Sequence, residues 1–420
     1  MTNSTTCPET SGYKQTAIGL IPFEWDVIKL NDLGTTFSGL SGKNKEDFGF
    51  GSPYIPYKNI FKNSRIDINY MDYVQVKSDE KQNKVKYGDL FFTVSSETVG
   101  EIGMTSVLLD EVENMYLNSF CFGFRLHNFN HLNPSFSSYL FRGETVRRKI
   151  IELAQGSTRF NLSKQGLLKL SLYLPPIQEQ QKIASILTAW DIAINKSKLM
   201  LEELIKQKKW LAYNLLFNKK KNNKNEVNNL VPLSKLLNRV KNPFTPDHQK
   251  YYKQIGIRSH TKGIFYKEKV SGLSLGNKSV FHIEPNCFIL NIVFAWEHAI
   301  AKTTLNEVGM IASHRFPMFK PVPDKLDLDY LLHFFKSQKG KDLLGLASPG
   351  GAGRNKTLGQ SDFLKLKIPV PNIKEQKIIA EVLDKADEEI LLYREKITNL
   401  QLQKKGLMQQ LLTGKVRVKI

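Results

Sequence analysis

Two short motifs of this chain look like parts of a nucleic-acid enzyme, and neither is complete. The loop with which amino-methyltransferases grip a flipped base needs Asn or Asp, two prolines and an aromatic residue. The segments NPSF at 133–136 and NPF at 242–244 lack a proline or the spacing, and are interpreted as turns. The segment GLSGK at 39–43 is too short to cradle a phosphate.

Metal-assisted cleavage has no complete set of ligands either. Asp247 and Asp324 each follow a proline, but neither is followed at useful range by the Glu and Lys that would hold a metal and activate water. The 8 histidines, His260 and His314 among them, form no metal-binding pair on one helix face. We therefore expect no catalytic residue, no metal and no cofactor on this chain.

The charge points instead to a polyanionic partner. The 420 residues contain 60 Lys+Arg and 40 Asp+Glu, a formal net charge of +20. No apolar run reaches the roughly 20 residues of a membrane span, so nucleic acid is favoured over a membrane. Three cysteines, Cys7, Cys121 and Cys287, lack metal-ligand spacing, and a reducing cytoplasm is the expected location.

The elements that would position a binding surface occur twice. Residues 174–219 align without a gap on residues 370–415, and 17 of the 46 pairs are identical, where chance gives about three. The identical pairs include Pro175/Pro371, Glu179/Glu375, Gln180/Gln376, Ala184/Ala380, Asp191/Asp387, Lys208/Lys404 and Leu215/Leu411. The repeat indicates a duplicated module.

Each copy predicts one long helix with an apolar seam. Steps of three and four residues between apolar positions are typical of a heptad, and each helix would be about 60 Å long. The predicted inter-helix packing residues are Ile183, Leu187, Trp190, Ile194, Leu201, Leu204, Leu211, Leu215, Ile379, Leu383, Ala386, Ile390, Tyr393, Ile397, Leu400, Leu407 and Leu411. The alternative is that each is a core helix of its own domain. Lys208 and Lys404 fall on the seam, where a polar group either fixes register or marks the end of the partner helix.

The fold class predicted from this pattern is α+β, with two globular domains separated by two long antiparallel coiled-coil helices in a pseudo-two-fold internal repeat. The predicted parts are domain 1 at 1–173, a helix at 174–217, a basic linker at 218–228, domain 2 at 229–369, a helix at 370–415 and a tail at 416–420. Each domain is expected to contain one helical patch, at 137–153 and 329–346.

The doubled helix-head motif resembles that of the specificity subunit of type I restriction-modification enzymes. The resemblance rests on PPIQEQ at 175–180, PNIKEQ at 371–376, GLIP at 19–22, AWE at 295–297 and the glycine-containing loops with Arg159 and Arg354. It covers nearly the whole chain.

The resemblance implies two target-recognition domains, each of which reads one half of a bipartite, asymmetric double-stranded DNA site. It implies two long helices that set the spacing and dock two modification (methyltransferase) subunits. S-adenosylmethionine, ATP and Mg are then expected on the modification and restriction subunits, with none on this chain, which would act in a bacterial or archaeal cytoplasm.

Turn-like stretches of the two domains supply the candidate DNA-binding residues. These are Lys58, Asn59, Ser95, Ser96 and Arg159 in domain 1, and Arg258, Ser259, His260, Trp296 and Arg354 in domain 2. Arginine can bind guanine and asparagine adenine, whereas lysine more often contacts phosphate. Arg159 and Arg354 lie in matching loops, which favours backbone contact or loop structure over base reading. For each residue the alternative is a solvated loop side chain.

Two other functions are compatible with parts of the pattern. A structural coiled-coil scaffold could bind nucleic acid through charge alone, without sequence preference. A self-sufficient enzyme would need a catalytic site outside the motifs described above.

Overall fold

The structure, a computed structural model, describes residues 12–16, 19–217, 230–276, 279–350 and 356–420. The chain divides into two compact units, unit 1 with Met1–Ser197 and Lys396–Ile420, and unit 2 with Lys198–Glu395. Unit 1 therefore combines two distant segments of the chain, whereas unit 2 is continuous. The basic linker predicted at 218–228 lies outside the described residues.

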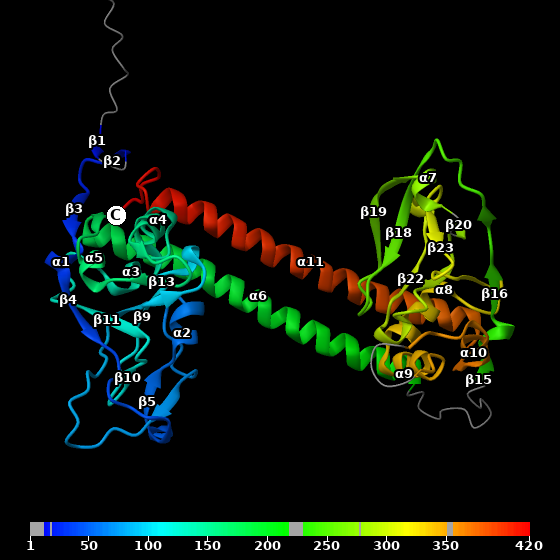
Figure 1. The fold of residues 1–420 in the computed structure, drawn as a ribbon, viewed down its shortest axis with the longest axis horizontal. Coiled ribbons are helices and arrows are strands. Elements are labelled where there is room, and N and C mark those ends of the chain that lie inside the picture. Colours follow the sequence, from blue (N-terminus) through cyan, green and yellow to red (C-terminus); the bar gives the residue numbers. More distant parts are fainter. Residues whose placement is uncertain (1–11, 17–18, 218–229, 277–278, 351–355) are drawn as a thin grey trace, which may run out of the picture. The chain divides into compact units, whose positions relative to one another are not determined.

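The globular part of unit 1 mixes short strands with short helices (Figure 1). Its strands are β1 (Tyr13–Thr16), β2 (Gly19–Pro22), β3 (Asp26–Lys29), β4 (Gly34–Ser38), β5 (Phe48–Ile55), β6 (Asp72–Val74), β7 (Leu90–Thr93), β8 (Ser95–Ser96), β9 (Thr105–Val107), β10 (Tyr116–Leu117), β11 (Cys121–Leu126), β12 (Ala154–Gln155), β13 (Phe160–Leu162) and β14 (Ser171–Leu174). Its short helices are α1 (Leu30–Leu33), η1 (Lys45–Asp47), α2 (Tyr57–Lys62), η2 (Val99–Glu101), α3 (Pro134–Leu140), α4 (Glu144–Glu152) and α5 (Lys164–Leu168).

Unit 2 uses a comparable set of elements. Its strands are β15 (Leu230–Pro232), β16 (Leu237–Val240), β17 (Pro243–Phe244), β18 (Tyr251–Ile257), β19 (Ile264–Ser271), β20 (Val280–His282), β21 (Phe288–Leu290), β22 (Ile300–Lys302), β23 (Ile311–Ser313), β24 (Met318–Pro321) and β25 (Lys367–Pro369). Its short helices are η3 (Leu233–Lys235), α7 (Gly272–Leu275), η4 (Ala295–Glu297), η5 (Leu305–Glu307), α8 (Leu328–Lys336), α9 (Gln338–Leu346) and α10 (Gln360–Lys365).

Both units are organised around a four-stranded sheet of the same topology. The strand order is β4-β11-β7-β9 in unit 1 and β16-β24-β21-β22 in unit 2, and every pairing in both sheets is antiparallel. In unit 1 the sheet is buried by stacked rings such as Phe92 on Phe122. Around this common centre the remaining sheets differ, since the five-stranded sheet of order β17-β20-β23-β18-β19 has no five-stranded counterpart among the residues of unit 1 that the structure describes.

Each predicted helical patch is two helices in the structure. A cap separates them, Gly143 at the start of α4 and Ser337 at the start of α9. At Gly143 a Cβ atom would lie 2.8 Å from Leu412 Cδ1, so the glycine lets the C-terminal segment approach closely. The NPSF motif at 133–136 is likewise a helix start, because Asn133 accepts a hydrogen bond from the Phe136 amide at 3.0 Å.

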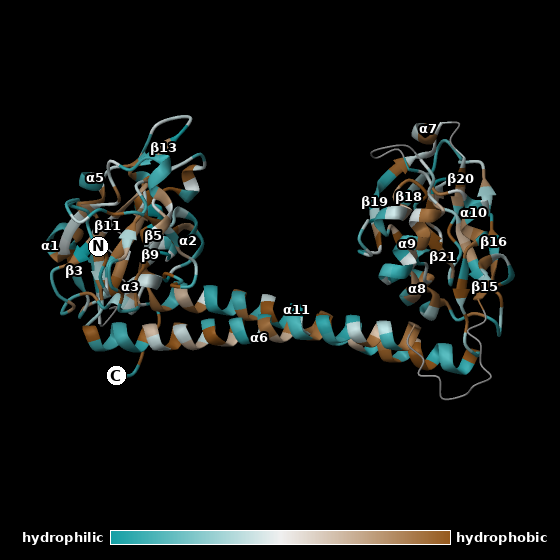
Figure 2. Ribbon diagram, turned by 90° about the horizontal axis from the view of Figure 1, so that it is seen from below, coloured by the Kyte–Doolittle hydropathy of each residue, from teal (hydrophilic) through white to brown (hydrophobic). Residues whose placement is uncertain are grey.

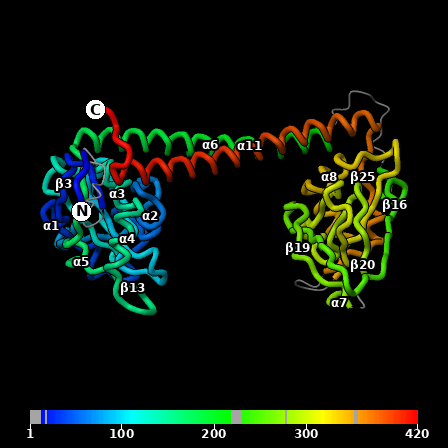
Figure 3. Tube along the Cα trace, turned by 90° about the horizontal axis from the view of Figure 1, so that it is seen from above, coloured from blue at the N-terminus to red at the C-terminus, as the bar shows by residue number. Residues whose placement is uncertain are grey.

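The two long helices predicted from the repeat are α6 (Ile177–Phe217) and α11 (Ile373–Leu411). Figure 3 shows them side by side, and Figure 2 shows hydrophobic and hydrophilic bands along both. All 17 predicted packing residues are buried or half-buried, and Ile183, Leu187, Ile379 and Leu383 are at most 3% exposed. Ile183 and Leu187 also belong to the core of domain 1, and Ile379 and Leu383 to that of domain 2. Each helix therefore starts as a core helix of its own domain, as the alternative has it, and continues along the seam.

Matching ion pairs fix the antiparallel register of the helices in each unit. Lys404 Nζ lies 2.6 Å from Asp191 Oδ1 in unit 1, and Lys208 pairs with Asp387 in unit 2. In the sequence both lysines and both aspartates are identical pairs of the repeat. A polar residue on the seam that finds its only complement at one position selects that register.

The glutamine of each helix head joins the helix to its globular domain. The Gln180 amide accepts the Asn133 N–H at 2.9 Å and donates to the His131 and Pro175 carbonyls at 2.8 Å. In unit 2, Gln376 makes the same three contacts, with the Asp327 N–H and the Lys325 and Pro371 carbonyls. Both side chains are fully buried, so the repeated motif serves the frame and not a ligand.

The preceding glutamate in unit 1 receives the segment that follows α11. Glu179 is fully buried and accepts hydrogen bonds from Arg417 at 2.7 and 2.9 Å and from Trp25 Nε1 at 3.3 Å. The carboxylates of Glu179 and Glu24 raise the pKa of Arg417. Residues around 412–417 thus complete the domain with which the described chain starts (Figures 1 and 3).

Candidate nucleic-acid interface

Three of the predicted contact residues of domain 1 form one surface cluster. β8, which carries Ser95 and Ser96, pairs with β13 just after Arg159. The exposed Arg159 guanidinium donates to Ser95 Oγ at 3.2 Å. This contact leaves most donors of Arg159 facing outward, where a guanidinium can bind phosphate or a base edge.

Helix α2 adds Lys58 and Tyr57 beside that cluster. Tyr57 donates to the Ser95 carbonyl at 3.0 Å, and Lys58 is exposed on the same short helix. Burial raises the pKa of Tyr57, so its hydroxyl stays a neutral donor at physiological pH. Tyr57 was missed by sequence reasoning, although it lies next to Lys58 in the stretch YIPYKNI.

Asn59 corrects the sequence prediction, because it faces the interior. Its side chain is fully buried and donates to the Asp67 and Tyr70 carbonyls at 2.9 and 2.8 Å. Its Oδ1 accepts the Asp67 N–H and the amide of Asn63. With its donors and acceptor used in this way, Asn59 shapes the loop after α2 and has no free edge for adenine.

Two half-buried arginines hold the loops of this cluster from behind. Arg142 donates to the carbonyls of Ile60, Phe61 and Asn63 at the end of α2, at 2.7 to 3.1 Å. Arg147 donates to the Gly103, Gly100 and Ile102 carbonyls next to η2. Burial lowers the pKa of Arg142 to about 10, which leaves the guanidinium charged and tied to backbone at neutral pH.

An exposed aromatic ring borders the same surface. Phe120 is 62% exposed, and its carbonyl accepts the Val94 N–H at 3.2 Å, directly before Ser95. Exposed aromatic rings beside arginine and lysine suit contact with bases or sugars. Phe120 was also missed; its only sequence signal is its place in the turn of LNSFCFGF.

In domain 2 the structure brings Ser259 and His260 against η4, which carries Trp296. Ser259 Oγ donates to Glu297 Oε2 at 2.9 Å, and the His260 N–H donates to the Glu297 carbonyl at 2.7 Å. Trp296 is half-buried, and its Nε1 donates to the Val293 carbonyl at 3.1 Å. Lys356 lies 5.5 Å from the centre of the Trp296 ring.

The backbone of this loop is held in an uncommon conformation. His260 and Thr261 have φ values of 59° and 57°, and His298 has 63°. Left-handed backbone is unfavourable for a β-branched residue such as Thr261, and such strain concentrates at functional sites. Burial lowers the pKa of the neighbouring His298 to about 4, so it is neutral at physiological pH.

Arg258 opens the loop and is one of its two exposed cations, with Lys262. Its guanidinium stacks 5.2 Å from the Phe265 ring centre, and its backbone N–H donates to Gly263. No carboxylate pairs with it among the described residues. The stacked, unpaired guanidinium is preorganised to meet guanine or phosphate. Arg354 lies outside the described residues.

The part of the chain that the structure describes contains neither a metal-binding cluster nor an activated thiol. No group of three or more His, Cys, Asp or Glu among them could hold a metal ion. Burial raises the pKa of Cys121 and of Cys287, so neither described thiol is an activated nucleophile. Among these residues, no helix is both long and apolar enough to span a membrane.

Comparison with known proteins identifies the family. The family profile described as type I restriction modification DNA specificity domain matches this chain twice, over residues 22–207 and 244–402. The chain belongs to this family. Each match contains most of one globular domain and a large part of the long helix that follows it.

Named relatives agree with the profile. The chain is 27% identical to the putative type I restriction enzyme MjaX specificity subunit of Methanocaldococcus jannaschii, over 97% of both chains. It is 25% identical to the MjaVIII specificity subunit of the same organism, over 67% of this chain and 70% of that one.

Solved structures share the fold at low identity. The S subunit of a type I system from M. genitalium aligns with 94% of this chain and 96% of its own, at a TM-score of 0.53 and 13% identity. A structure from work on assembly and conformational transition of a type I R-M system aligns with 94% of this chain and 99% of its own, at a TM-score of 0.58 and 13% identity.

Family membership confirms the main sequence predictions. The α+β fold with two target-recognition domains and two long helices is confirmed, as is the function of a specificity subunit of a type I restriction-modification system. Such subunits are the DNA-recognition component and not the catalytic one, which makes DNA and the restriction-modification complex the partners of the chain.

Proposed function

We propose that each target-recognition domain reads one half of a bipartite, asymmetric double-stranded DNA site. The observation that carries this proposal is the contrast between a shared frame and unlike surfaces. Both units repeat the buried glutamine and the Asp–Lys pair. Their candidate contact surfaces differ, with Ser95 and Arg159 in one and Arg258 stacked on Phe265 in the other. Different donor sets select different bases.

The long helices would set the gap between the two half-sites. Their register is defined by ion pairs and a continuous apolar seam, so they suit the role of a ruler. A four-residue insertion near Asn195 should therefore change the gap and leave the letters of both half-sites unchanged. An insertion that altered the letters and kept the gap would contradict this role.

The helices would also dock two modification subunits, on which S-adenosylmethionine is bound. Apolar side chains on their outer faces support this, since large exposed patches mark interaction sites. The exposed set on α6 is Ile192, Leu199, Met200, Trp210 and Tyr213, and on α11 Ile378, Val382, Leu391, Leu392 and Leu402. Restriction subunits that use ATP and Mg would complete the assembly, in the bacterial or archaeal cytoplasm where host DNA lies.

The decisive experiment is methylome sequencing of the host with and without this gene. We expect a bipartite methyladenine motif that disappears on deletion and returns when the gene is restored. Exchange of residues 230–365 for those of another family member should change one half-site only. An unchanged methylome after deletion would contradict the proposal.

Competition binding separates this function from a non-specific scaffold. The purified complex with modification subunits should prefer its target over random DNA by a factor of roughly a thousand or more at physiological salt. A scaffold that binds through charge alone would show no such ratio. The chain alone should neither methylate nor cleave DNA, which would exclude a self-sufficient enzyme.

A further inference from the structure

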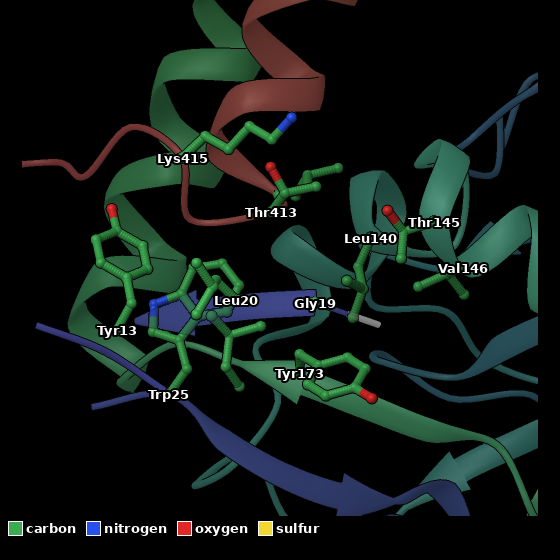
Figure 4. Close-up of a pocket in the computed structure, with 12 residues that line it drawn as sticks. Tyr13, Gly19, Leu20, Trp25, Leu140, Thr145, Val146, Tyr173, Thr413 and Lys415 are labelled. Carbon is green, nitrogen blue, oxygen red and sulfur yellow. The ribbon is translucent and has the colours of Figure 1, made fainter. Parts of the chain in front are cut away.

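An apolar pocket of about 630 Å³ lies in unit 1, where the segment after α11 meets the globular domain. Figure 4 shows its walls: Leu140, Thr145 and Val146 come from α3 and α4, and Thr413 and Lys415 follow α11. Tyr13 of β1, Tyr173 of β14 and Trp25, which lies between β2 and β3, close it from the other side. None of these residues belongs to the candidate DNA-binding surface.

The internal repeat gives two walls of this pocket, the one from α3 and α4 and the one from the segment after α11, a counterpart in unit 2. The caps of α3 and α8, Asn133 and Asp327, receive the equivalent glutamines, and the caps of α4 and α9 follow ten residues later in both units. Leu140 and Thr145 therefore correspond to Phe334 and Lys339. The aligned repeat pairs Thr413 with Phe217.

In unit 2 the corresponding place is filled by a side chain of the protein itself. The Phe217 ring packs edge-on against Phe334 with 5.7 Å between ring centres. Lys339 Nζ lies 4.7 Å above the same ring. The counterparts of Leu140 and Thr145 thus hold an aromatic ring, and Thr413 leaves that ring out in unit 1.

The rim of the pocket indicates the charge of what enters. A second hollow of about 730 Å³ shares Leu140, Thr145, Val146, Leu412, Thr413 and Lys415 with the first. Its outer wall adds Arg148 and Lys405, which are exposed like Lys415. The single acidic lining residue, Glu144, is paired with Arg148 and Gln409, so Lys405 and Lys415 give the rim its net positive charge. The rim therefore complements an acidic segment.

We propose that this pocket takes an aromatic side chain from an acid-flanked segment of the modification subunit. The inference rests on the proposed function, which supplies that partner. A single aromatic anchor buried in a preformed pocket, with charges at its rim, is the usual arrangement of an interface hot spot.

Two other occupants fit the pocket less well. A second copy of this chain would carry the same net charge of +20 to a basic rim. Residues 1–11, MTNSTTCPETS, contain no aromatic residue to enter the pocket.

The test is to fill the pocket from within, as unit 2 does. The modification subunit of the same host system is titrated into the wild-type chain, Thr413→Phe and a control, Gln165→Phe, by isothermal titration calorimetry. The control adds the same ring on α5, at an exposed residue that lines neither hollow. We expect Thr413→Phe to weaken binding about tenfold or more, Gln165→Phe to bind like the wild type, and the melting temperature of Thr413→Phe to be unchanged or higher.

A charge-reversal variant, Lys405→Glu with Lys415→Glu, tests the rim independently. It should weaken binding several-fold at low salt, with a smaller effect at high salt, because salt screens exposed charges. If Thr413→Phe lowers the melting temperature, this variant decides the question alone.

Each contrary outcome is distinct. Wild-type affinity in Thr413→Phe, or in the charge-reversal variant at low salt, overturns the pocket and leaves the proposed function standing. Failure of the wild-type chain to bind the modification subunit overturns the proposed docking itself. Self-association that Thr413→Phe abolishes would assign the pocket to a second copy. Removal of residues 1–11 is also compared in the wild type and in Thr413→Phe. A melting temperature that falls in the wild type and not in Thr413→Phe would assign the pocket to that segment. Either result overturns the proposal.

Discussion

The junction between helix pair and globular domain has the same frame in both units and different neighbours around it. In unit 1, Tyr139 donates to Asp191 at 2.8 Å, and Arg65 bridges Tyr139 and Thr188. In unit 2, His333 takes the place of Tyr139 and Asp384 the place of Thr188, and His333 Nε2 lies 2.8 Å from Asp384 Oδ1.

The difference shows what the repeat preserves. The residues that bridge the two helices, or join helix to domain, are identical, whereas the side chains that pack around them have changed in size and charge. Burial raises the pKa of Tyr139 to about 12, so the Tyr139 hydroxyl stays protonated and uncharged. Burial lowers the pKa of His333, opposed by its hydrogen bond to Asp384, so the other junction contains a histidine that is harder to protonate than a free imidazole. Only the frame is constrained to be alike in the two halves.

Loss of the frame glutamines should have the largest effect. Gln376→Leu and Gln180→Leu each remove three hydrogen bonds and leave a buried N–H and two carbonyls without them, at a cost of about 3 kcal/mol. Urea denaturation should show the same loss for both variants, each in its own unit. Loss in only one unit would break the equivalence of the two helix heads.

Arginine substitutions should separate the two surfaces next. Arg258→Ala should relax the base specificity of one half-site, with a loss of about 2 kcal/mol in discrimination against the wrong base. The reason is that the stacked guanidinium of Arg258 is free to bind a base. Arg159→Ala, whose guanidinium already bonds Ser95, should weaken binding to all sequences alike. Affinities for a set of single-base variants of the target would check this, and the reverse pattern would exchange the two roles.

Loss of either inter-helix ion pair should have the next largest effect, and should lower the free energy of unfolding by about 1 to 2 kcal/mol. Asp387→Asn should cost more than Asp191→Asn, because Lys336 lies 3.4 Å from Asp387 as a second cation. Burial opposes ionisation of Asp387, but the hydrogen bond from Lys208 and the charges of Lys336 and Lys208 hold its pKa below the usual value. Thermal denaturation measures both losses, and equal losses would contradict the contribution of Lys336.

Mild acid should produce the smallest effect and confine it to unit 2. The pKa values of His333 and His298 lie below the 6.5 of an unfolded histidine, so below that pH the unfolded chain binds more protons than the folded one. This stability is present above pH 6.5 and falls as the pH drops toward 5, by about 1 kcal/mol after screening. Limited proteolysis at pH 7 and 5 should show earlier cleavage around α8 than around α3. His333→Tyr should reduce the difference; equal acid sensitivity of both junctions would contradict it.

The helices could be predicted from sequence because the heptad spacing lies within each helix segment and the segment occurs twice. The heptad spacing of residues such as Leu187 and Leu383 named the seam, and the identity of Lys208 with Lys404 marked a place where something other than packing was selected. Their partners, Asp191 and Asp387, were visible as identical pairs. Which lysine meets which aspartate depends on the antiparallel register, which only the fold supplies.

The contact surface was harder to predict because turn residues are ambiguous. Asn59 and Arg159 both lie in polar loop-like stretches, yet one is buried under the loop after α2 and the other is exposed. The pairing of Arg417 with Glu179 could not be predicted either, since 238 residues separate them. Phe217 and Thr413 differ in the alignment without any sign that one leaves a pocket.

The bond between Arg417 and Glu179 has a consequence for biosynthesis. A ribosome releases the strands and helices of unit 1 first, but the cation that neutralises the buried Glu179 is translated only after α11. Unit 2, which is continuous from Lys198 to Glu395, needs no such wait. The globular domain of unit 1 is therefore translated first but completed last. A premature stop codon just after α11 would damage this N-terminal domain.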